Sequence, residues 1–499
     1  MKSKIVVVGF MIVLVGTQAG FWARELDAEE SDRSSSLQQA VGLLQSAAIH
    51  AARGQNADAE RCCRELLDSP ELLQHVDPHR IRTLLGISIG RQNRRAEAFE
   101  LLTNVLTEQQ AILGEDHPHV ESTRSYMGWL SYEITWTPAM RIGGPAQQYE
   151  PAIAVAEEAI RLRLGNGYWQ LALLKLRQGQ GSASIEAMRR SFQEDGGWLG
   201  QFPILSLALL ADGQEELARD AYAVARDRAA KTRTVWESIQ QLLDQAAGEL
   251  KMTGTDPASS LSREQFVAAY GRLIAAFPDL ERLYAWRANH LACLGHLEDA
   301  VKDLERAAEA EPDNWRFAEG LAAMRLVLAD PSDQTKICRE LWDDSLEKGR
   351  FGARGGDMDL VVMCSLAAHA DLDRQALLDR ADDILRRTPT RAFLELGRGM
   401  ALYRCDKFEE ALQTIPGENA GLGDQKNQGL ALIFRAMAHY RLGERFSARQ
   451  LLQKAQDLYA KTFSSPGIVR MPFQDAGVVD CMLRLALEEA RELIAADDD

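Results

Sequence analysis

Apolar and small residues recur at helical spacing along most of the chain, and the clearest stretch runs from Glu281 to Asn314. Side chains three and four positions apart share one face of a helix. Such faces are found at Tyr284, Ala288 and Leu291, and again at Ala300, Leu304 and Ala307. Gly295 separates the two segments and Pro312 follows the second, as is typical of helix ends. The stretch therefore predicts two short antiparallel helices joined by a turn.

Pairs of small residues twelve positions apart mark a repeated unit. In this stretch the pair is Ala288 and Ala300. The same spacing recurs at Gly86 and Ala98, Ala172 and Ser184, Ser206 and Ala218, Gly399 and Ala411, and Ala436 and Ala448. Small residues let two helices approach closely, so a leucine in place of Ala300 should cost ~1–3 kcal/mol through overpacking.

One unit departs from this spacing. From Gly128 to Ala152 the distance is stretched by twelve residues, through an insertion at 134–150. The insertion contains Trp136, Pro138, Gly143, Gly144 and Pro145. Because proline and glycine interrupt helices, we expect this segment not to be continuous helix.

The repeated unit resembles the tetratricopeptide repeat, whose length is about 34 residues. With Glu281 as position 1, the small residues fall at positions 8, 20 and 27, and Pro312 falls at position 32, which match the small-residue and proline positions of that repeat. The resemblance implies an all-α fold, a tetratricopeptide-like helical-hairpin solenoid that winds as a right-handed superhelix. We expect two arrays, at 37–250 and 263–496, joined by a linker at 251–262 that is rich in Gly, Pro and Ser. A capping helix should close the second array.

Four segments are similar to the repeat arrays attached to certain bacterial serine/threonine protein kinases. They are GNGYWQLALLKLRQGQ at 165–180, LSLALLADGQEELARDAY at 205–222, GMALYRCDKFEEAL at 399–412 and RAMAHYRLGERFSARQLLQKA at 435–455. The chain itself lacks the glycine-rich loop, the VAIK lysine and the HRD and DFG motifs of a kinase. We therefore expect no enzyme activity. Two functions stay open, a non-catalytic protein-interaction scaffold and a regulatory subunit-like protein of a serine/threonine kinase signalling system.

The first 23 residues have the order of an export signal. Lys2 and Lys4 precede an apolar run at 5–16, and Ala19 supplies a small-residue cleavage site. An uncleaved anchor at 5–23 is the alternative, since that length approaches a bilayer span. A polar spacer at 24–36 follows. We expect an exported protein, periplasmic or extracellular, or one tethered to the membrane.

The net charge and the placement of cysteine and histidine argue against a nucleic-acid partner and a bound metal ion. The formal net charge is −16, which argues against nucleic acid as the main partner because phosphates repel an acidic protein. The seven cysteines are thinly spread and form no CxxC pair, and the closest histidine pairs lack a third ligand. We expect no metal, no cofactor and no catalytic residue.

The resemblance implies a concave groove, lined by the first helix of each repeat, that holds an extended peptide or partner segment. By repeat position the candidate groove residues are Trp129, Tyr132, Trp169, Arg177, Asn289, Tyr403, Arg404, Tyr440 and Arg441, with Met400 and Met437 in the same register. The alternative for Tyr403 and Tyr440 is packing between repeats. Only Asn289 matches the residues of tetratricopeptide domains that clamp a C-terminal carboxylate, since Ala285 stands where those domains have lysine.

Overall fold

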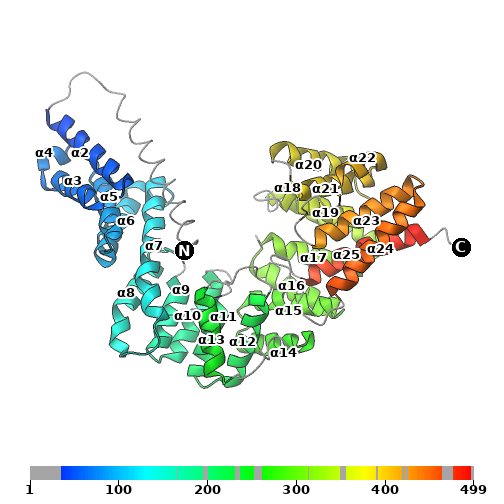
Figure 1. The fold of residues 1–499 in the computed structure, drawn as a ribbon, viewed down its shortest axis with the longest axis horizontal. Coiled ribbons are helices and arrows are strands. Elements are labelled where there is room, and N and C mark those ends of the chain that lie inside the picture. The colour runs from blue at the N-terminus through cyan, green and yellow to red at the C-terminus, as the bar shows by residue number, and fades with distance from the viewer. Residues whose placement is uncertain are drawn as a thin grey trace. The chain divides into compact units, whose positions relative to one another are not determined.

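The computed structural model describes residues 35–165, 167–194, 200–230, 237–251, 261–312, 314–348, 356–388, 391–417, 422, 425–463 and 476–495. In these residues the secondary structure is α-helix with one short 3-10 helix (Figure 1). The predicted signal or anchor at 1–23, and all of the predicted spacer except its last two residues, lie outside the described residues. Among the described residues, none of the helices combines the length and the apolar character that a membrane span needs. The chain divides into two compact units, 1–196 and 197–499, called here the N-terminal and C-terminal units.

The N-terminal unit is a series of antiparallel helix pairs in which each helix packs on its neighbours in sequence. Its helices are α2 (Ser35–Ala52), α3 (Asn56–Asp68), α4 (Pro70–Leu73), α5 (Pro78–Arg91), α6 (Arg95–Leu113), α7 (Pro118–Met140), η1 (Ala146–Tyr149), α8 (Glu150–Arg161), α9 (Gly167–Arg177) and α10 (Gly181–Glu194).

The C-terminal unit is also built from antiparallel helix pairs. Its helices are α11 (Gln201–Ala211), α12 (Glu215–Ala230), α13 (Glu237–Glu249), α14 (Arg263–Ala276), α15 (Glu281–Cys293), α16 (Leu297–Ala310), α17 (Trp315–Leu328), α18 (Pro331–Lys348), α19 (Gly356–Leu366), α20 (Arg374–Arg387), α21 (Ala392–Arg404), α22 (Phe408–Thr414), α23 (Gln425–Arg441), α24 (Arg445–Phe463) and α25 (Ala476–Ala495). The last helix, α25, departs from this pattern because it packs on helices far from it in the sequence.

The predicted small residues are buried in three hairpins, and in two of these the pair is in contact. Ala288, Ala300 and Ala307 are fully buried between α15 and α16. In two other hairpins the residues twelve positions apart hydrogen-bond each other, since the Ser184 hydroxyl donates to the Ala172 carbonyl and the Ser206 hydroxyl to the Ala218 carbonyl, both at 2.7 Å. The all-α, tetratricopeptide-like array of helical hairpins is therefore confirmed, and the hand of its superhelix stays a prediction.

Each of these hairpins turns at a residue with positive φ, seven positions after the first small residue. In the α15–α16 hairpin this residue is Gly295, at φ 84°, and the His296 N–H donates to the Leu291 carbonyl at 2.9 Å. This is the Schellman arrangement that ends a helix. The equivalent turn residues are Gly54, Asn93, Gly179, Gly213, Asp406 and Gly443. A turn residue with positive φ is thus a second repeat signal, carried by Asn or Asp where glycine is absent.

The insertion at 134–150 is interrupted, as predicted, but only after Met140. α7 runs unbroken through Trp136 and Pro138 to Met140, so the first half of the insertion is helix. Pro138 lies in the last turn, where its missing N–H removes a single hydrogen bond to the preceding turn. The loop after it is fixed by Tyr149, whose hydroxyl donates to the Gly143 carbonyl at 3.0 Å. The segment is therefore not one continuous helix, as predicted, but the helix ends at Met140, after Pro138, because a proline near a helix end costs little.

The predicted linker lies within the C-terminal unit. Residues 252–260 are outside the described residues, but α14, which follows them, packs on α12, the helix that precedes α13. Arg272 of α14 makes a bidentate ion pair with Asp220 of α12, at 2.7 and 2.6 Å. The compact units divide at 196 and 197 instead. A division of the repeats into arrays at 251–262 stays a prediction.

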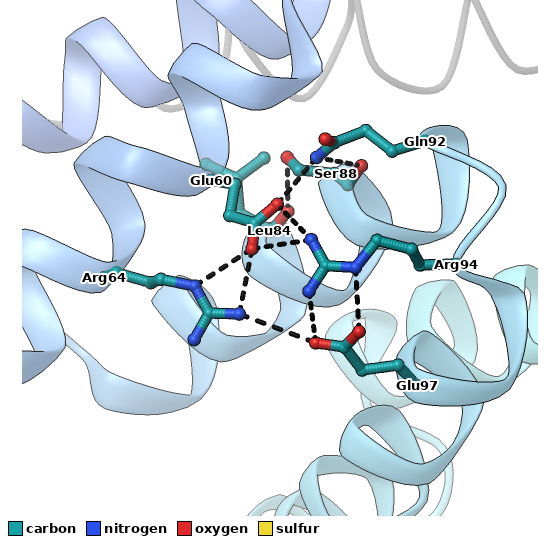
Figure 2. Close-up of polar contacts among 7 residues, drawn as sticks. All are labelled: Glu60, Arg64, Leu84, Ser88, Gln92, Arg94 and Glu97. Carbon is teal, nitrogen blue, oxygen red and sulfur yellow. Dashed lines mark hydrogen bonds and ion pairs between the residues drawn. The ribbon is translucent and has the colours of Figure 1, made fainter.

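A polar network joins α3 to the turn between α5 and α6 in the N-terminal unit (Figure 2). Glu60 of α3 is 8% exposed, and its carboxylate accepts hydrogen bonds from Arg94 at 2.8 and 2.9 Å, from Arg64 at 2.9 Å and from Gln92 at 2.7 Å. Burial alone would raise the pKa of Glu60, but these hydrogen bonds outweigh it and hold the pKa below its ordinary value.

This lowered pKa makes the N-terminal unit sensitive to acid. A carboxyl whose pKa is lower in the folded than in the unfolded chain stabilises the fold above its unfolded pKa of about 4.3. That stability is lost as the pH falls through the folded pKa. We expect Glu60→Gln to destabilise the unit at pH 7 and to lose less further stability than wild type between pH 5 and pH 2. Urea denaturation across that pH range measures both effects. Glu65→Gln, an exposed position on the same helix, is the control and should follow wild type.

Candidate protein-interaction site

In the C-terminal unit α25 lies on the first helices of several hairpins between α15 and α23. α25 contacts α15, α17 and α19 as well as the neighbouring α23 and α24 (Figure 1). A helix that only capped the array would contact its last hairpin, so the predicted capping role describes part of what α25 does. From α15 to α23, the face predicted to hold a partner segment is covered by α25 of the same chain.

Glycines let α25 approach this face closely. A Cβ atom placed on Gly429 of α23 would lie 2.7 Å from a methyl carbon of Leu483, and one placed on Gly477 would lie 2.5 Å from the Asn289 carbonyl oxygen. Real side chains essentially never reach such distances without a shift of their neighbours. Larger residues at these positions would therefore push α25 away from α23 and α15.

Two polar contacts fix the register of α25. The Asn289 side-chain carbonyl accepts a hydrogen bond from the Gly477 backbone N–H, at the start of α25. Near its other end, Glu489 forms a bidentate pair with Arg404 of α21, both bonds at 2.5 Å, and Arg404 also donates to the Ser365 carbonyl at 2.7 Å. Asn289 and Arg404, two of the predicted groove residues, thus bind α25 of the same chain.

Apolar burial makes α25 part of the core. Its buried side chains are Val479, Cys481, Met482, Leu483, Leu485, Ala486, Leu487, Ala490 and Ile494. Full burial of a large apolar side chain stabilises by about 1.5–3 kcal/mol, so release of this helix would cost more than a typical partner segment could offset. The contact of α25 with the first helices from α15 to α23 is consequently a stable interface inside the C-terminal unit.

The remaining candidates of this unit lie at or near that interface. Tyr403 is 4% exposed, and its ring centroid is 5.5 Å from those of both Phe408 and Phe434. Tyr403 therefore packs between repeats, which was the alternative to its predicted place in the groove. Tyr440 is half-buried against the core, whereas Arg441 is exposed. Met400 and Met437 are fully buried.

In the N-terminal unit, half-buried aromatic residues follow one side of α7. We call Trp129, Tyr132 and Trp136 the α7 aromatic strip. Tyr132 stacks on Trp136 with ring centroids 5.6 Å apart and planes 13° apart. Trp169 of α9, which is 4% exposed, supports the strip from behind, with its centroid 5.3 Å from that of Trp136. All three strip residues keep partial exposure.

Backbone and charge contacts hold the strip in place. Arg177, a predicted groove residue, donates from Nε to the Ala139 carbonyl at 2.8 Å and so ties the end of α7 to α9. Burial, with a smaller effect of the Glu133 charge, raises the pKa of Tyr132, so its phenol stays protonated at neutral pH. Trp136 was missed in the sequence because it was assigned to a loop, although its spacing of four and seven from Tyr132 and Trp129 places it on their face.

Metal-ligating side chains do not gather into a metal site in the part of the chain that the structure describes. No group of three or more His, Cys, Asp or Glu side chains is arranged there for a metal ion.

Comparison with known proteins gives similarity to helical-repeat structures only. No protein-family model matches the chain, and no curated protein matches it. The chain is similar to a chain of the APC/C hetero-tetramer Cut9–Hcn1, at 10% identity and a TM-score of 0.33, covering 91% of this chain and 96% of that one. It is also similar to yeast Tom70, at 13% identity and a TM-score of 0.29, covering 100% and 99%.

A third similar structure is human IFIT1, solved as a dimer with m7Gppp-AAAA, at 15% identity and a TM-score of 0.22, covering 80% and 93%. All three TM-scores are low. These likenesses therefore carry no argument about partner or function, and the fold assignment rests on the hairpins of the chain itself.

Proposed function

We propose that this protein is a non-catalytic interaction scaffold that binds a segment of a partner protein on the α7 aromatic strip. The observation that carries the proposal is the contrast between the two units. In the C-terminal unit α25 covers the first helices from α15 to α23, whereas in the N-terminal unit α7, the first helix of its hairpin, presents three partly exposed aromatic side chains.

The chemistry of the strip fits an apolar anchor on an extended partner segment. Tryptophan and tyrosine give large contact areas at low conformational cost, and they dominate the energetics of protein interfaces. Because Trp169 and Arg177 already fix the strip from behind, little side-chain ordering is left for binding to offset. Of the predicted groove residues, Trp129 and Tyr132 are the two we propose to contact the partner.

Loss of these two rings should weaken partner binding. We expect Trp129→Ala combined with Tyr132→Ala to lower affinity by about 10–1000-fold, since each anchor ring contributes about 1–2 kcal/mol or more. A photoreactive phenylalanine at position 129 of the full-length protein, expressed in its own cell, identifies the partner by crosslinking and mass spectrometry. Binding of that partner to wild type and to the double variant then gives the affinity change.

A matched control separates this site from the rest of the surface. Trp315 of α17 is a half-buried tryptophan in the C-terminal unit, so Trp315→Ala should leave binding unchanged and a crosslinker at 315 should give no adduct. Protein adducts at 315 but not at 129 would move the site to the other unit. Adducts with nucleic acid alone would contradict the scaffold proposal.

We further propose that the protein is exported, on the basis of the basic, apolar and small-residue order of residues 1–23. Fractionation and N-terminal sequencing test this, and a mature chain that begins after Ala19 is the expected result. An intact N-terminus in the membrane fraction would support the anchor at 5–23. Recovery of the intact chain from the cytoplasm would instead favour the alternative, a regulatory partner of a serine/threonine kinase system.

A further inference from the structure

α22 is half as long as α16, which holds the same place in its hairpin. It has seven residues and begins three residues before the small residue Ala411, whereas α16 begins three residues before Ala300 and has fourteen. α22 ends early because Pro416 follows Ile415, and the residue before a proline is disfavoured in the helical conformation. Ile415 is accordingly extended, at φ −65° and ψ 123°. α22 therefore stops about two turns short of the length of α16.

A cavity of about 270 Å³ lies at this early end of α22, and we call it the α23–α24 cavity. Pro416, just after the end of α22, lines it together with residues of α23 and α24. α23 packs on both α22 and α24 (Figure 1). The volume is close to the lower end of the range for pockets that hold small organic ligands, which begins at about 300 Å³. The side chains whose chemistry decides the ligand are Leu422, Ala431, Leu432, Arg435, Lys454 and Leu458.

Most of the cavity wall is apolar and fixed in place. Leu422 is buried, and Leu432 of α23 and Leu458 of α24 are half-buried around the cavity. Ile415, which holds the end of α22, is 2% exposed and packs so closely on Gly399 that a Cβ atom there would overlap it. The walls are thus formed by core packing before any ligand binds, which lowers the ordering cost of binding.

Two cationic side chains line the cavity, and its lining residues include no carboxylate. Pro416 has no N–H to donate to the Leu412 carbonyl, and Arg435 replaces it. Its Nη1 donates to the carbonyls of Leu412 and Ile415, both at 3.0 Å. These bonds occupy one nitrogen of the guanidinium and leave its other donors for a ligand. Within the described residues Arg435 forms no ion pair with a carboxylate. Lys454, which is exposed, adds a second positive charge.

We propose that the α23–α24 cavity binds a small organic carboxylate with an apolar chain. The carboxylate pairs with Arg435, and the chain lies between Leu432 and Leu458. A carboxylate is planar and accepts two parallel N–H bonds from a guanidinium. Phosphate or sulfate would instead direct oxygen atoms at leucine side chains, where they find no hydrogen-bond donor. The site belongs to the C-terminal unit and does not depend on partner binding at the α7 aromatic strip.

Calorimetric titration of the full-length protein with octanoate tests the proposal. We expect saturable binding at one site in the micromolar to millimolar range, and octan-1-ol, which has the same chain without the charge, should bind at least about tenfold more weakly. Arg435→Gln keeps an amide donor for the two carbonyls and removes the charge, so it should weaken octanoate binding about 10–100-fold. Arg449→Gln, an exposed position of α24 outside the cavity lining, is the matched control and should bind octanoate as wild type does.

Photocrosslinking locates the bound chain. An octanoate analogue with a diazirine at the end of its chain, irradiated with the wild-type protein, should give adducts on the peptides that contain Leu432 or Leu458. The proposal is overturned by adducts on other peptides alone, by the absence of octanoate binding at millimolar concentration, by equal binding of octanoate and octan-1-ol, or by unchanged binding in Arg435→Gln. Because the crosslink and the octan-1-ol comparison use the wild-type chain, they decide the matter even where Arg435→Gln does not fold.

Discussion

Leu483→Asp is expected to unfold much of the C-terminal unit, including helices almost two hundred residues earlier in the sequence. Leu483 is 2% exposed and lies against Gly429, so the aspartate would place an unpaired charge where no water reaches it. The lost apolar contact alone costs about 2–5 kcal/mol, and the buried charge adds to it. Hydrogen exchange should show the backbone amides of α15 and α17 losing protection on the order of a hundredfold or more.

The distance between the substitution and its effect is what makes this result informative. α25 contacts α15 through Gly477, which is 188 positions from Asn289 in the sequence. A terminal helix that merely covered the last hairpin would transmit nothing to α15. Glu488→Ala, an exposed position on the same helix, is the control and should change stability by less than about 0.5 kcal/mol. Unchanged protection of α15 in Leu483→Asp would contradict the placement of α25.

The hairpins could be predicted from the sequence because their contacts are local. Ala288 and Ala300 are twelve positions apart and both fully buried, and two other pairs with this spacing, Ala172 with Ser184 and Ser206 with Ala218, are joined by a hydrogen bond. Such contacts depend only on helical periodicity and on one turn, so the pattern of small residues contains them. The positive-φ turn residues, Asn93 and Asp406 among them, were overlooked because glycine alone was taken as the turn signal.

The position of α25 could not be predicted in the same way. Leu483, Leu487 and Ile494 share one side of this helix, which by itself indicates an amphipathic cap such as the sequence predicts. Cys481, Met482 and Leu485 are also buried, so the helix is apolar on more than one side. A helix of that kind belongs inside a core. The sequence therefore contained evidence for a central helix, but which helices surround it depends on contacts between distant segments that no local pattern encodes.

The candidate site could be predicted only in part, because repeat register is local but the position of α25 is not. Repeat register placed Trp129 and Tyr132 on the first helix of their hairpin, where the structure has them half-buried. The same register placed Asn289 and Arg404 on an equivalent face of the C-terminal unit. Because α25 fills that face, both side chains are used to bind it. Register identifies which residues share a face, and only the structure shows whether that face is already filled.

Arg404 and Arg441 provide a matched comparison for this conclusion, since they hold the same place in successive repeats. We expect Arg404→Met to lower the free energy of unfolding of the C-terminal unit by about 2–4 kcal/mol, because it leaves the Glu489 carboxylate without its partner in a largely buried place. Arg441 is exposed and interacts with the Tyr403 phenol, so Arg441→Met should cost only about 0.5–1.5 kcal/mol, the worth of one hydrogen bond. Urea denaturation followed by circular dichroism measures both, with hydrogen exchange assigning the transition to the C-terminal unit.

A double variant shows whether the cost comes from the unpaired charge or from the lost bonds. In Arg404→Met with Glu489→Met both charges are removed and apolar side chains of similar length take their place. Since an apolar pair often replaces a buried ion pair with little loss, most of the stability should return. An equal loss in the single and double variants would mean that the hydrogen bonds themselves hold α25. A loss in Arg404→Met no larger than in Arg441→Met would mean that α25 does not depend on this pair, and that its register is fixed by Asn289 and the glycines alone.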